Sequence, residues 1–217
     1  MITSRKNYYL YLSCVFFFLF AIFTVLVVNG VFIEVDRYMN THIPYSSTNI
    51  FYPVSLIMAD LFLPLFVIIS ILFAYFIKQK RKEDILLLFT SFSGFLASEV
   101  ILKPIFRIPC PQTYYSGRIL EVSNILHFFG LKETCYPSGH TASYVVFSGC
   151  FAYFAYRYIK RVWLRRTLYI ICGVIIILVG PSRLYLHVHW LSDVIAAYLL
   201  GFGLLSLIAY YFSENFS

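Results

Sequence analysis

His189 and Asp193 stand four positions apart at the start of the last apolar run of the chain. On a helix this spacing places both side chains on one face. The carboxylate can then accept the Nδ1–H of the imidazole, which leaves Nε2 with a free lone pair and stabilises the positive charge that forms when Nε2 attacks phosphorus. An ordinary surface pair has the same spacing, but Arg183, six residues before the histidine across a short turn, favours an activated nucleophile beside an anion-binding group.

Two cations are suited to holding a phosphate. The Arg183 guanidinium is a rigid bidentate fork, and the Lys103 ammonium is a point charge. Phosphoryl transfer spreads negative charge over three equatorial oxygens, and its catalysis is mostly positioning and charge stabilisation. Lys103 also follows Glu99 by four residues, so it can pair with that carboxylate or extend toward the membrane boundary as well as bind phosphate.

The run Pro137-Ser138-Gly139-His140 leads directly into an apolar stretch. Glycine lets backbone approach an anion closely, and the first N–H groups of a helix point at that anion with the favourable end of the helix dipole. We expect Ser138 to cap this helix or to bond a phosphate oxygen. The sequence therefore predicts a second phosphate-binding element.

Composition places these residues in a membrane protein. The 217 residues are 60% hydrophobic and only 12% charged, with a mean hydropathy of +0.78, whereas a soluble domain is about half apolar and a quarter charged. The formal charge of +7 is divided among short clusters between apolar runs. This pattern fixes orientation in a bilayer and lacks the continuous basic face that nucleic-acid binding requires.

Six stretches approach the roughly 20 apolar residues that a bilayer crossing needs. We therefore predict an all-α, integral membrane bundle of six transmembrane helices in a single domain, residues 1–217. The first stretch follows Arg5 and Lys6 and could be a signal peptide, but it is longer than an h-region and no A-x-A-like site follows it. The predicted spans are residues 8–28, 54–77, 85–102, 141–158, 167–182 and 191–212.

Lysine and arginine form three clusters: before the first predicted span, between the second and third, and between the fourth and fifth. With six spans, all three clusters lie on one side, which the positive-inside rule makes cytoplasmic together with both termini. The opposite side then carries residues 29–53, 103–140 and 181–190, which include the candidate site.

Taken together, the clusters resemble the three motifs of the type 2 phosphatidic acid phosphatase superfamily, K-x6-R-P, P-S-G-H and S-R-x5-H-x3-D. The second and third motifs match in full at residues 137–140 and 182–193, and the first begins at Lys103. The resemblance implies that His189 is a nucleophile that forms a phosphohistidine. It also implies that His140 protonates the departing lipid oxygen and then activates water, without a metal or another cofactor.

The resemblance further implies a membrane lipid phosphate as substrate. The compact positive-inside pattern suggests a bacterial cytoplasmic membrane, with the site on the periplasmic or extracellular face. Bacterial members of the superfamily act on undecaprenyl diphosphate, phosphatidylglycerol phosphate, phosphatidate or lipid A phosphates. A phosphotransferase from polyprenyl diphosphate to another lipid would carry the same motifs. A non-catalytic transporter or lipid-binding protein is a third alternative, which the presence of His189, His140, Asp193 and Arg183 disfavours.

A zinc site formed by His140, His187 and His189 is the main alternative chemistry. His187 and His189 are two residues apart, cannot share a helical face, and have no H-E-x-x-H or paired-cysteine spacing beside them. We interpret His187, like His42 and His127, as a surface or loop histidine. Two ionisable residues at predicted membrane depth, Asp60 and Glu99, are further candidates for a role near the site.

The first motif departs from the family pattern, because Cys110 occupies the position of its arginine although Pro111 is retained. We predict that Arg107, or else Arg118, supplies the missing charge. Cys110 and Cys135 both fall in the long outer loop, and on an oxidising side of the membrane they could form a disulfide. Closing such a loop would contribute about 3 kcal/mol and would hold the first motif near P-S-G-H.

Overall fold

The computed structural model describes residues 2–44, 51–60, 68, 71–72, 75, 78–79, 81–111 and 134–213, with the side chains of residues 2–6 and 58–60 excepted. The described chain is helical, apart from an isolated antiparallel bridge between Pro109 and Thr134. The helices are α1 (Ile2–Val28), α2 (Ile33–His42), α3 (Phe51–Asp60), α5 (Lys82–Ser91), α6 (Ser93–Phe95), the π-helical η1 (Leu96–Leu102), α7 (Lys103–Phe106), α9 (Gly139–Tyr158), α10 (Val162–Tyr185) and α11 (Leu191–Phe212).

Within the described residues, four continuous helical stretches are long and apolar enough to cross a membrane: Asn7–Val28, Lys82–Phe106, Val162–Tyr185 and Leu191–Phe212. The first and last agree with the predicted spans 8–28 and 191–212. The observed stretch Lys82–Phe106 is longer than the predicted span 85–102, because α5, α6, η1 and α7 join end to end. The predicted span 167–182 begins five residues too late, because α10 starts at Val162 directly after a short turn.

The two other predicted spans have different outcomes. Helix α9 covers the predicted span 141–158 in full, but it is not among the stretches that meet the criterion of length and hydropathy. Most of the predicted span 54–77 lies outside the described residues, which give only its beginning in α3 and single positions beyond it. The bundle of six spans and the single domain stay predictions.

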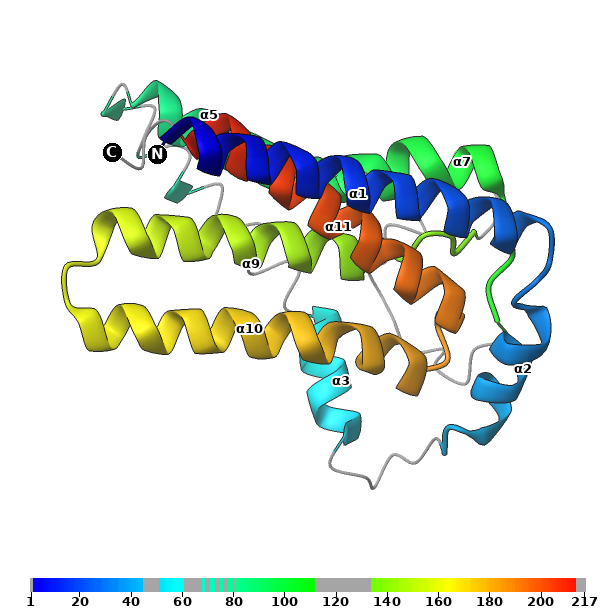
Figure 1. Ribbon diagram of the computed structural model, residues 1–217. Helices are drawn as coiled ribbons and strands as arrows, with labels where there is room; N and C mark the ends of the chain where they lie inside the picture. Colours follow the sequence, from blue (N-terminus) through cyan, green and yellow to red (C-terminus); the bar gives the residue numbers. More distant parts are fainter. Residues whose placement is uncertain are drawn as a thin grey trace.

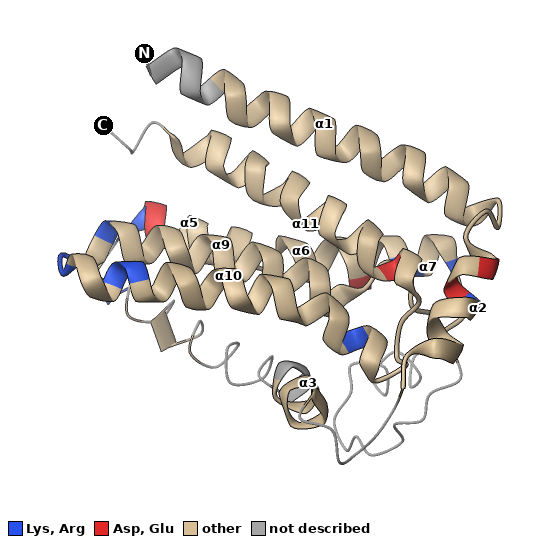
Figure 2. Cartoon of the chain, turned by 60° about the horizontal axis from the view of Figure 1, so that its bottom comes forward, with Lys and Arg blue, Asp and Glu red and all other residues tan. Residues whose placement is uncertain are grey.

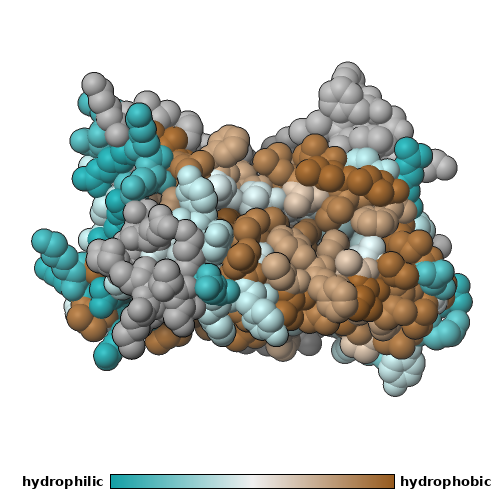
Figure 3. All heavy atoms as spheres, turned by 45° about the horizontal axis from the view of Figure 1, so that its top comes forward, coloured by the Kyte–Doolittle hydropathy of each residue, from teal (hydrophilic) through white to brown (hydrophobic). Residues whose placement is uncertain are grey.

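The helices pack lengthwise, with α1 beside α11 and the α9–α10 hairpin beside them (Figure 1). Helix α1 begins and α11 ends at the same end of the bundle as the α9–α10 connection (Figure 1). Lysine and arginine gather at this end (Figure 2), which we call the basic end. An apolar belt separates it from the polar far end on the face shown in Figure 3.

The interior changes character along the bundle. Toward the basic end, α5, α9 and α11 enclose an apolar cluster that includes Leu87, Phe147 and Phe212. At the far end the buried residues are mostly polar, and they include Ser138, Thr141, Ser182, Arg183, His187, His189, Ser192 and Asp193. Buried polar groups of this density are costly unless they are bonded to one another or to a ligand, which marks the far end as the candidate site.

Helix α10 is bonded to α11 through the side chain of Tyr198. The hydroxyl of Tyr198 accepts from the Gly180 N–H at 3.1 Å and donates to the Ile176 carbonyl at 2.6 Å. Those two backbone groups would bond each other in a regular helix. Because Pro181 follows and lacks an N–H, the tyrosine supports α10 one turn before Arg183.

Candidate active site

The candidate nucleophile lies between α10 and α11. His189 is 7% exposed, and its Nδ1 lies 3.3 Å from Oδ2 of Asp193, which is fully buried. The same Oδ2 accepts the Trp190 N–H at 2.9 Å, so Asp193, in the first turn of α11, also takes part in the cap of this helix. A carboxylate at Nδ1 holds the proton on that nitrogen and leaves Nε2 with a free lone pair.

The charges around His189 act on its titration. Burial lowers the pKa of His189, and the positive charges of Lys103 and Arg183 lower it further. The hydrogen bond and the negative charge of Asp193 act in the opposite direction, but the result is a pKa below 6.5. The imidazole is therefore neutral, and able to attack an electrophile, at neutral pH.

The P-S-G-H segment is fixed to both α11 and α1. The Ser138 N–H donates to the Asp193 carbonyl at 3.1 Å, and the Thr24 and Tyr136 hydroxyls lie 2.7 Å apart. Ser138 is fully buried, and its Oγ accepts the Thr141 N–H at 3.5 Å. It therefore caps α9, as one of the two predictions for this residue proposed. His140 follows in the first turn of α9, where it is half-buried.

Glycine is needed at the start of α9 because a side chain lies against it. A Cβ at Gly139 would overlap the Glu99 carboxylate. Glu99 is in turn bound to Lys103, whose Nζ lies 2.7 Å and 2.8 Å from the two carboxylate oxygens. Glu99 thus brings the lysine of the first motif to the N-terminus of α9, and the predicted ion pair between these two residues is present.

Arg183 is the largest of the fully buried side chains, at 1% exposure. Its Nη2 donates to the Ser55 carbonyl of α3 at 2.9 Å, and its Nε donates to the Ser182 hydroxyl at 3.2 Å. A buried guanidinium is stable only when its donors are bonded and a counter-charge is near. The structure thus places a cation at the end of α10, close enough to His189 to affect its titration.

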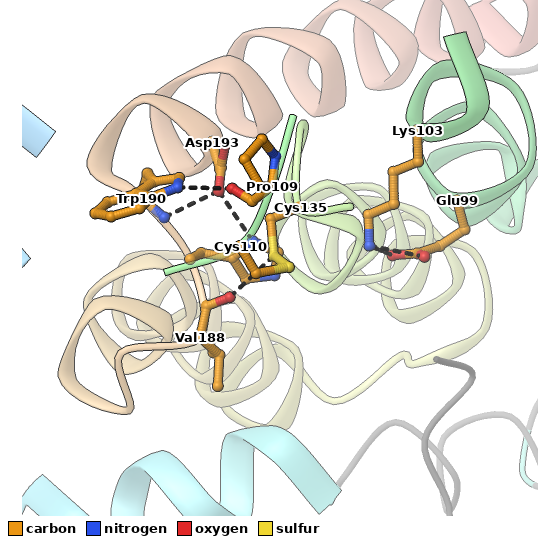
Figure 4. The surroundings of a disulfide bond; sticks show 9 residues. Glu99, Lys103, Pro109, Cys110, Cys135, Val188, Trp190 and Asp193 are labelled. Atoms are coloured by element: carbon orange, nitrogen blue, oxygen red, sulfur yellow. Dashed lines mark hydrogen bonds and ion pairs between the residues drawn. A yellow bond between two sulfur atoms is a disulfide. The ribbon is translucent and has the colours of Figure 1, made fainter. Parts of the chain in front are cut away.

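Cys110 and Cys135 form a disulfide with a Cα–Cα distance of 5.0 Å (Figure 4). Beside it, the Cys135 N–H donates to the Ile108 carbonyl at 2.9 Å, and the Trp190 indole donates to the Pro109 carbonyl at 2.9 Å. The Cys135 sulfur lies 3.3 Å from the Val188 carbonyl oxygen. The bond therefore joins the end of the first motif, the start of P-S-G-H and the loop that carries His189.

Loss of this disulfide is expected to destabilise the fold. A bond across 25 residues lowers the conformational entropy of the unfolded chain and so raises the free energy of unfolding by about 3 kcal/mol. A Cys110→Ser, Cys135→Ser variant should therefore unfold at a lower temperature in detergent, by several degrees, and reductant should lower the wild-type transition in the same way. Cys14→Ser, which removes a free exposed thiol, is the control. Gel mobility that reductant leaves unchanged after thiol blocking would contradict the bond.

The structure places the two candidates for the missing first-motif charge differently. Arg107 is exposed, adopts a left-handed backbone at φ 51°, and its Nε donates to the Pro104 carbonyl at 3.0 Å. Arg118 lies outside the described residues, and so does the side chain of Asp60. A phosphate contact of either arginine stays a prediction.

The interpretation of His187 as a surface or loop histidine is right about the loop and wrong about the surface. This residue is 1% exposed, has a left-handed backbone at φ 52°, and its Nδ1 lies 2.9 Å from the Asn40 side-chain oxygen. Asp36 and Ser192, which bond each other beside Asp193, were not predicted from the sequence. The sequence shows only that Asp36 is an acidic residue in the outer segment 29–53, and this position does not indicate which residue it bonds.

The potential metal ligands around His189 differ from the three-histidine set. Among the described residues, ligand atoms of Cys135, His189 and Asp193 lie within 4.8 Å of one another. Metal binding to cysteine requires a thiolate, whereas this sulfur is part of the disulfide. The Nδ1 atoms of His187 and His189 face Asn40 and Asp193 respectively. The donor set fits a hydrogen-bonded nucleophile better than a metal.

Comparison with known proteins agrees with this geometry. Residues 83–217 match the model of the PAP2 superfamily. A segment of 74 residues is 38% identical to phosphatidylglycerophosphatase B of Bacillus subtilis (strain 168), which covers 34% of this chain and 36% of that protein. The aligned part thus spans about a third of the relative's length.

The fold has a solved counterpart. The crystal structure of a transmembrane PAP2-type phosphatidylglycerolphosphate phosphatase from Bacillus subtilis superposes with a TM-score of 0.72. The match covers 95% of this chain and 98% of the other at 25% identity. Together with the apolar helices, this likeness identifies an integral membrane protein. The family model covers more than half of the chain, including all of the second and third motifs, and the protein therefore belongs to the PAP2 superfamily.

Proposed function

We propose that the protein hydrolyses a phosphate ester or diphosphate of a membrane lipid through a phosphohistidine at His189. The observation that carries this proposal is the arrangement of one buried imidazole, a carboxylate at its Nδ1 and two cations that act on its charge. Such a site holds a neutral nucleophile and accommodates a phosphate of negative charge. The N-terminus of α9 adds backbone N–H groups for the same anion.

In the first step, Nε2 of His189 attacks phosphorus and forms an N–P bond while the P–O bond to the lipid breaks. His140 donates a proton to the departing lipid oxygen, and Asp193 stabilises the imidazolium. In the second step, His140 accepts a proton from water, the water oxygen bonds phosphorus, and the N–P bond breaks to release inorganic phosphate. Lys103 and Arg183 stabilise the equatorial oxygens in both steps, and no step uses a metal.

The substrate that we propose first is phosphatidylglycerol phosphate, because both relatives described above are named for hydrolysis of that lipid. Undecaprenyl diphosphate, phosphatidate and lipid A phosphates present the same reacting group and are the further candidates. A phosphotransferase would differ only in the second step, where a lipid hydroxyl replaces water. The two activities separate by whether phosphate appears in solution or on an added lipid acceptor.

For the topology, we propose six spans with both termini in the cytoplasm of a bacterial cell and the site at the periplasmic or extracellular boundary. The positively charged end of the bundle, which also holds the start of α1 and the end of α11 (Figures 1 and 2), supports this orientation through the positive-inside rule. The Cys110–Cys135 disulfide supports it independently, since disulfides persist in oxidising compartments.

The test is a rapid-quench experiment with purified protein and lipids labelled in the terminal phosphate. Wild-type protein should acquire an acid-labile, base-stable label at His189 within one turnover and then release inorganic phosphate. Phosphatidylglycerol phosphate should give the highest kcat/KM of the four lipids. Release of phosphate without a covalent label at any quench time would exclude the phosphohistidine, and label that passes to a lipid alcohol would identify a phosphotransferase.

A further inference from the structure

Helix α2 contacts both ends of the loop that carries His189. Asp36 and Asn40 are four residues apart, so they lie on one face of this helix. Asn40 forms a hydrogen bond with His187, two residues before His189, and Asp36 forms one with Ser192, three residues after it. The contacts join segments separated by 147 and 156 residues in sequence.

The contact of Asp36 is a pair of hydrogen bonds. Its Oδ1 accepts the Ser192 N–H at 2.9 Å, and its Oδ2 accepts the Ser192 hydroxyl at 2.6 Å. Asp36 and Ser192 are 9% and 3% exposed, respectively. The Ser192 N–H belongs to the first turn of α11, whose amides have no partner within their own helix. Asp36 therefore supplies from another helix the cap that this turn needs.

The contact of Asn40 restrains a residue with unusual backbone geometry. The His187 Nδ1 lies 2.9 Å from the Asn40 side-chain oxygen, and His187 has a φ of 52°. A left-handed conformation is disfavoured for residues other than glycine, and it persists only where the surroundings fix it. Asn40 therefore fixes the start of the loop, as Asp36 fixes its end.

The opposite face of α2 is turned outward. Val35 and Tyr38 are 47% and 59% exposed. The ion pair between Glu34 and Arg37 is exposed as well. The buried contacts of α2 with the loop are thus confined to one face. None of the proposed chemical steps uses Asp36, Asn40 or Ser192. Ser192 directly precedes Asp193 and bonds Asp36, and Asn40 bonds His187, two residues before His189.

We propose that Asp36 and Asn40 are positioning residues that clamp both ends of the 187–192 loop and so fix His189 for attack on phosphorus. This inference rests on the proposed role of His189. Loss of the clamp would leave the phosphate-binding groups in place but allow the imidazole to move. Misplacement of a reacting group by about 1 Å can cost 10²-fold in rate, so the effect should fall on kcat rather than on KM.

The experiment compares Asp36→Ala, Asp36→Asn and Asn40→Ala with the wild type by the phosphate-release assay, at protein concentrations corrected for the folded fraction. We expect Asp36→Ala to lower kcat about 100-fold with KM changed less than threefold. Asp36→Asn should recover most of this loss, because its amide can accept the Ser192 N–H and donate to the Ser192 hydroxyl. Glu34→Ala, on the exposed face of the same helix, is the matched control and should match the wild type.

Hydrogen exchange provides a readout that does not depend on activity. Amides of residues 187–193 should exchange faster in Asp36→Ala and Asn40→Ala than in the wild type and Glu34→Ala. An unchanged kcat for Asp36→Ala in an active enzyme would overturn the clamp, and so would unchanged exchange in this segment. Equal losses in Asp36→Ala and Asp36→Asn would also overturn it, because geometry would then not be the cause. A wild type that forms no phosphohistidine would instead contradict the proposed function.

Discussion

Replacement of His189 by alanine is expected to lower kcat for lipid phosphate hydrolysis by about 10⁶-fold, the scale of losing a nucleophile that acts as part of a unit. The physical reason is that no other side chain among the described residues has the same environment, with a carboxylate 3.3 Å from Nδ1 and a pKa that burial, together with two nearby cations, lowers. Without Nε2, the phosphate would still be bound, so KM should change much less than kcat. Steady-state phosphate release with the preferred lipid measures both constants.

The control for this variant is His42→Ala. His42 lies at the exposed end of α2 with its ring stacked on Tyr38, at 4.0 Å between ring centroids, and its loss should leave kcat within about twofold. A thermal unfolding transition close to that of the wild type would show that His189→Ala is folded. A folded His189→Ala protein with more than a tenth of wild-type kcat would contradict the assignment of the nucleophile.

Replacement of Arg183 by methionine is expected to have two separate effects. The first is a fall in kcat/KM of about 10³-fold, since a guanidinium that stabilises phosphoryl-transfer charge contributes on this scale. The second is on pH dependence. Burial is the main cause of the lowered pKa of His189, and the positive charge of Arg183 lowers this pKa further. Removal of the positive charge raises the pKa of His189, and the acid limb of the kcat/KM profile should move to higher pH.

Arg183→Lys separates the effect of the charge from the effect of the guanidinium geometry. Lysine keeps the charge but not the fork that reaches both Ser55 and Ser182, so this variant should lose activity without the shift of the acid limb. Arg107→Met removes an exposed cation and tests the prediction that Arg107 replaces the first-motif arginine. An Arg183→Met enzyme whose acid limb stays at the wild-type pH would contradict the electrostatic coupling of Arg183 to His189.

The pairing of His189 with Asp193 was predicted from their spacing, but its geometry was not. His189 lies in the loop before α11, which begins at Leu191, so the two residues do not share a helical face, and the contact runs from this loop to the first turn of α11. The bounds of α11 were predicted to the residue, since a polar turn ends abruptly at Leu191 and the apolar run continues to Phe212. Patterns of this kind are local, and the helix that forms from them needs little information from the rest of the chain.

Other features depend on contacts between distant segments. Asp36 and Asn40 show no pattern that indicates Ser192 and His187, because the pairs lie about 150 residues apart and α2 is short and polar. The π-helical turn Leu96–Leu102 is also invisible in composition. The late start predicted for the fifth span arose from Arg165 and Arg166, which were read as part of a connection. Long basic side chains can lie on the first turns of a span and extend to the interface.

The hydrogen bonds of Tyr198 between α11 and α10 indicate which substitutions would disturb the candidate site. Helix α11 carries Asp193 in its first turn, bonds the P-S-G-H segment through the Asp193 carbonyl, and bonds the backbone of α10 through the Tyr198 hydroxyl. The positions of His189, of the P-S-G-H segment and of Arg183 thus all depend on contacts with this one helix. We therefore expect a change of packing in α11 near Tyr198 to displace all three groups together.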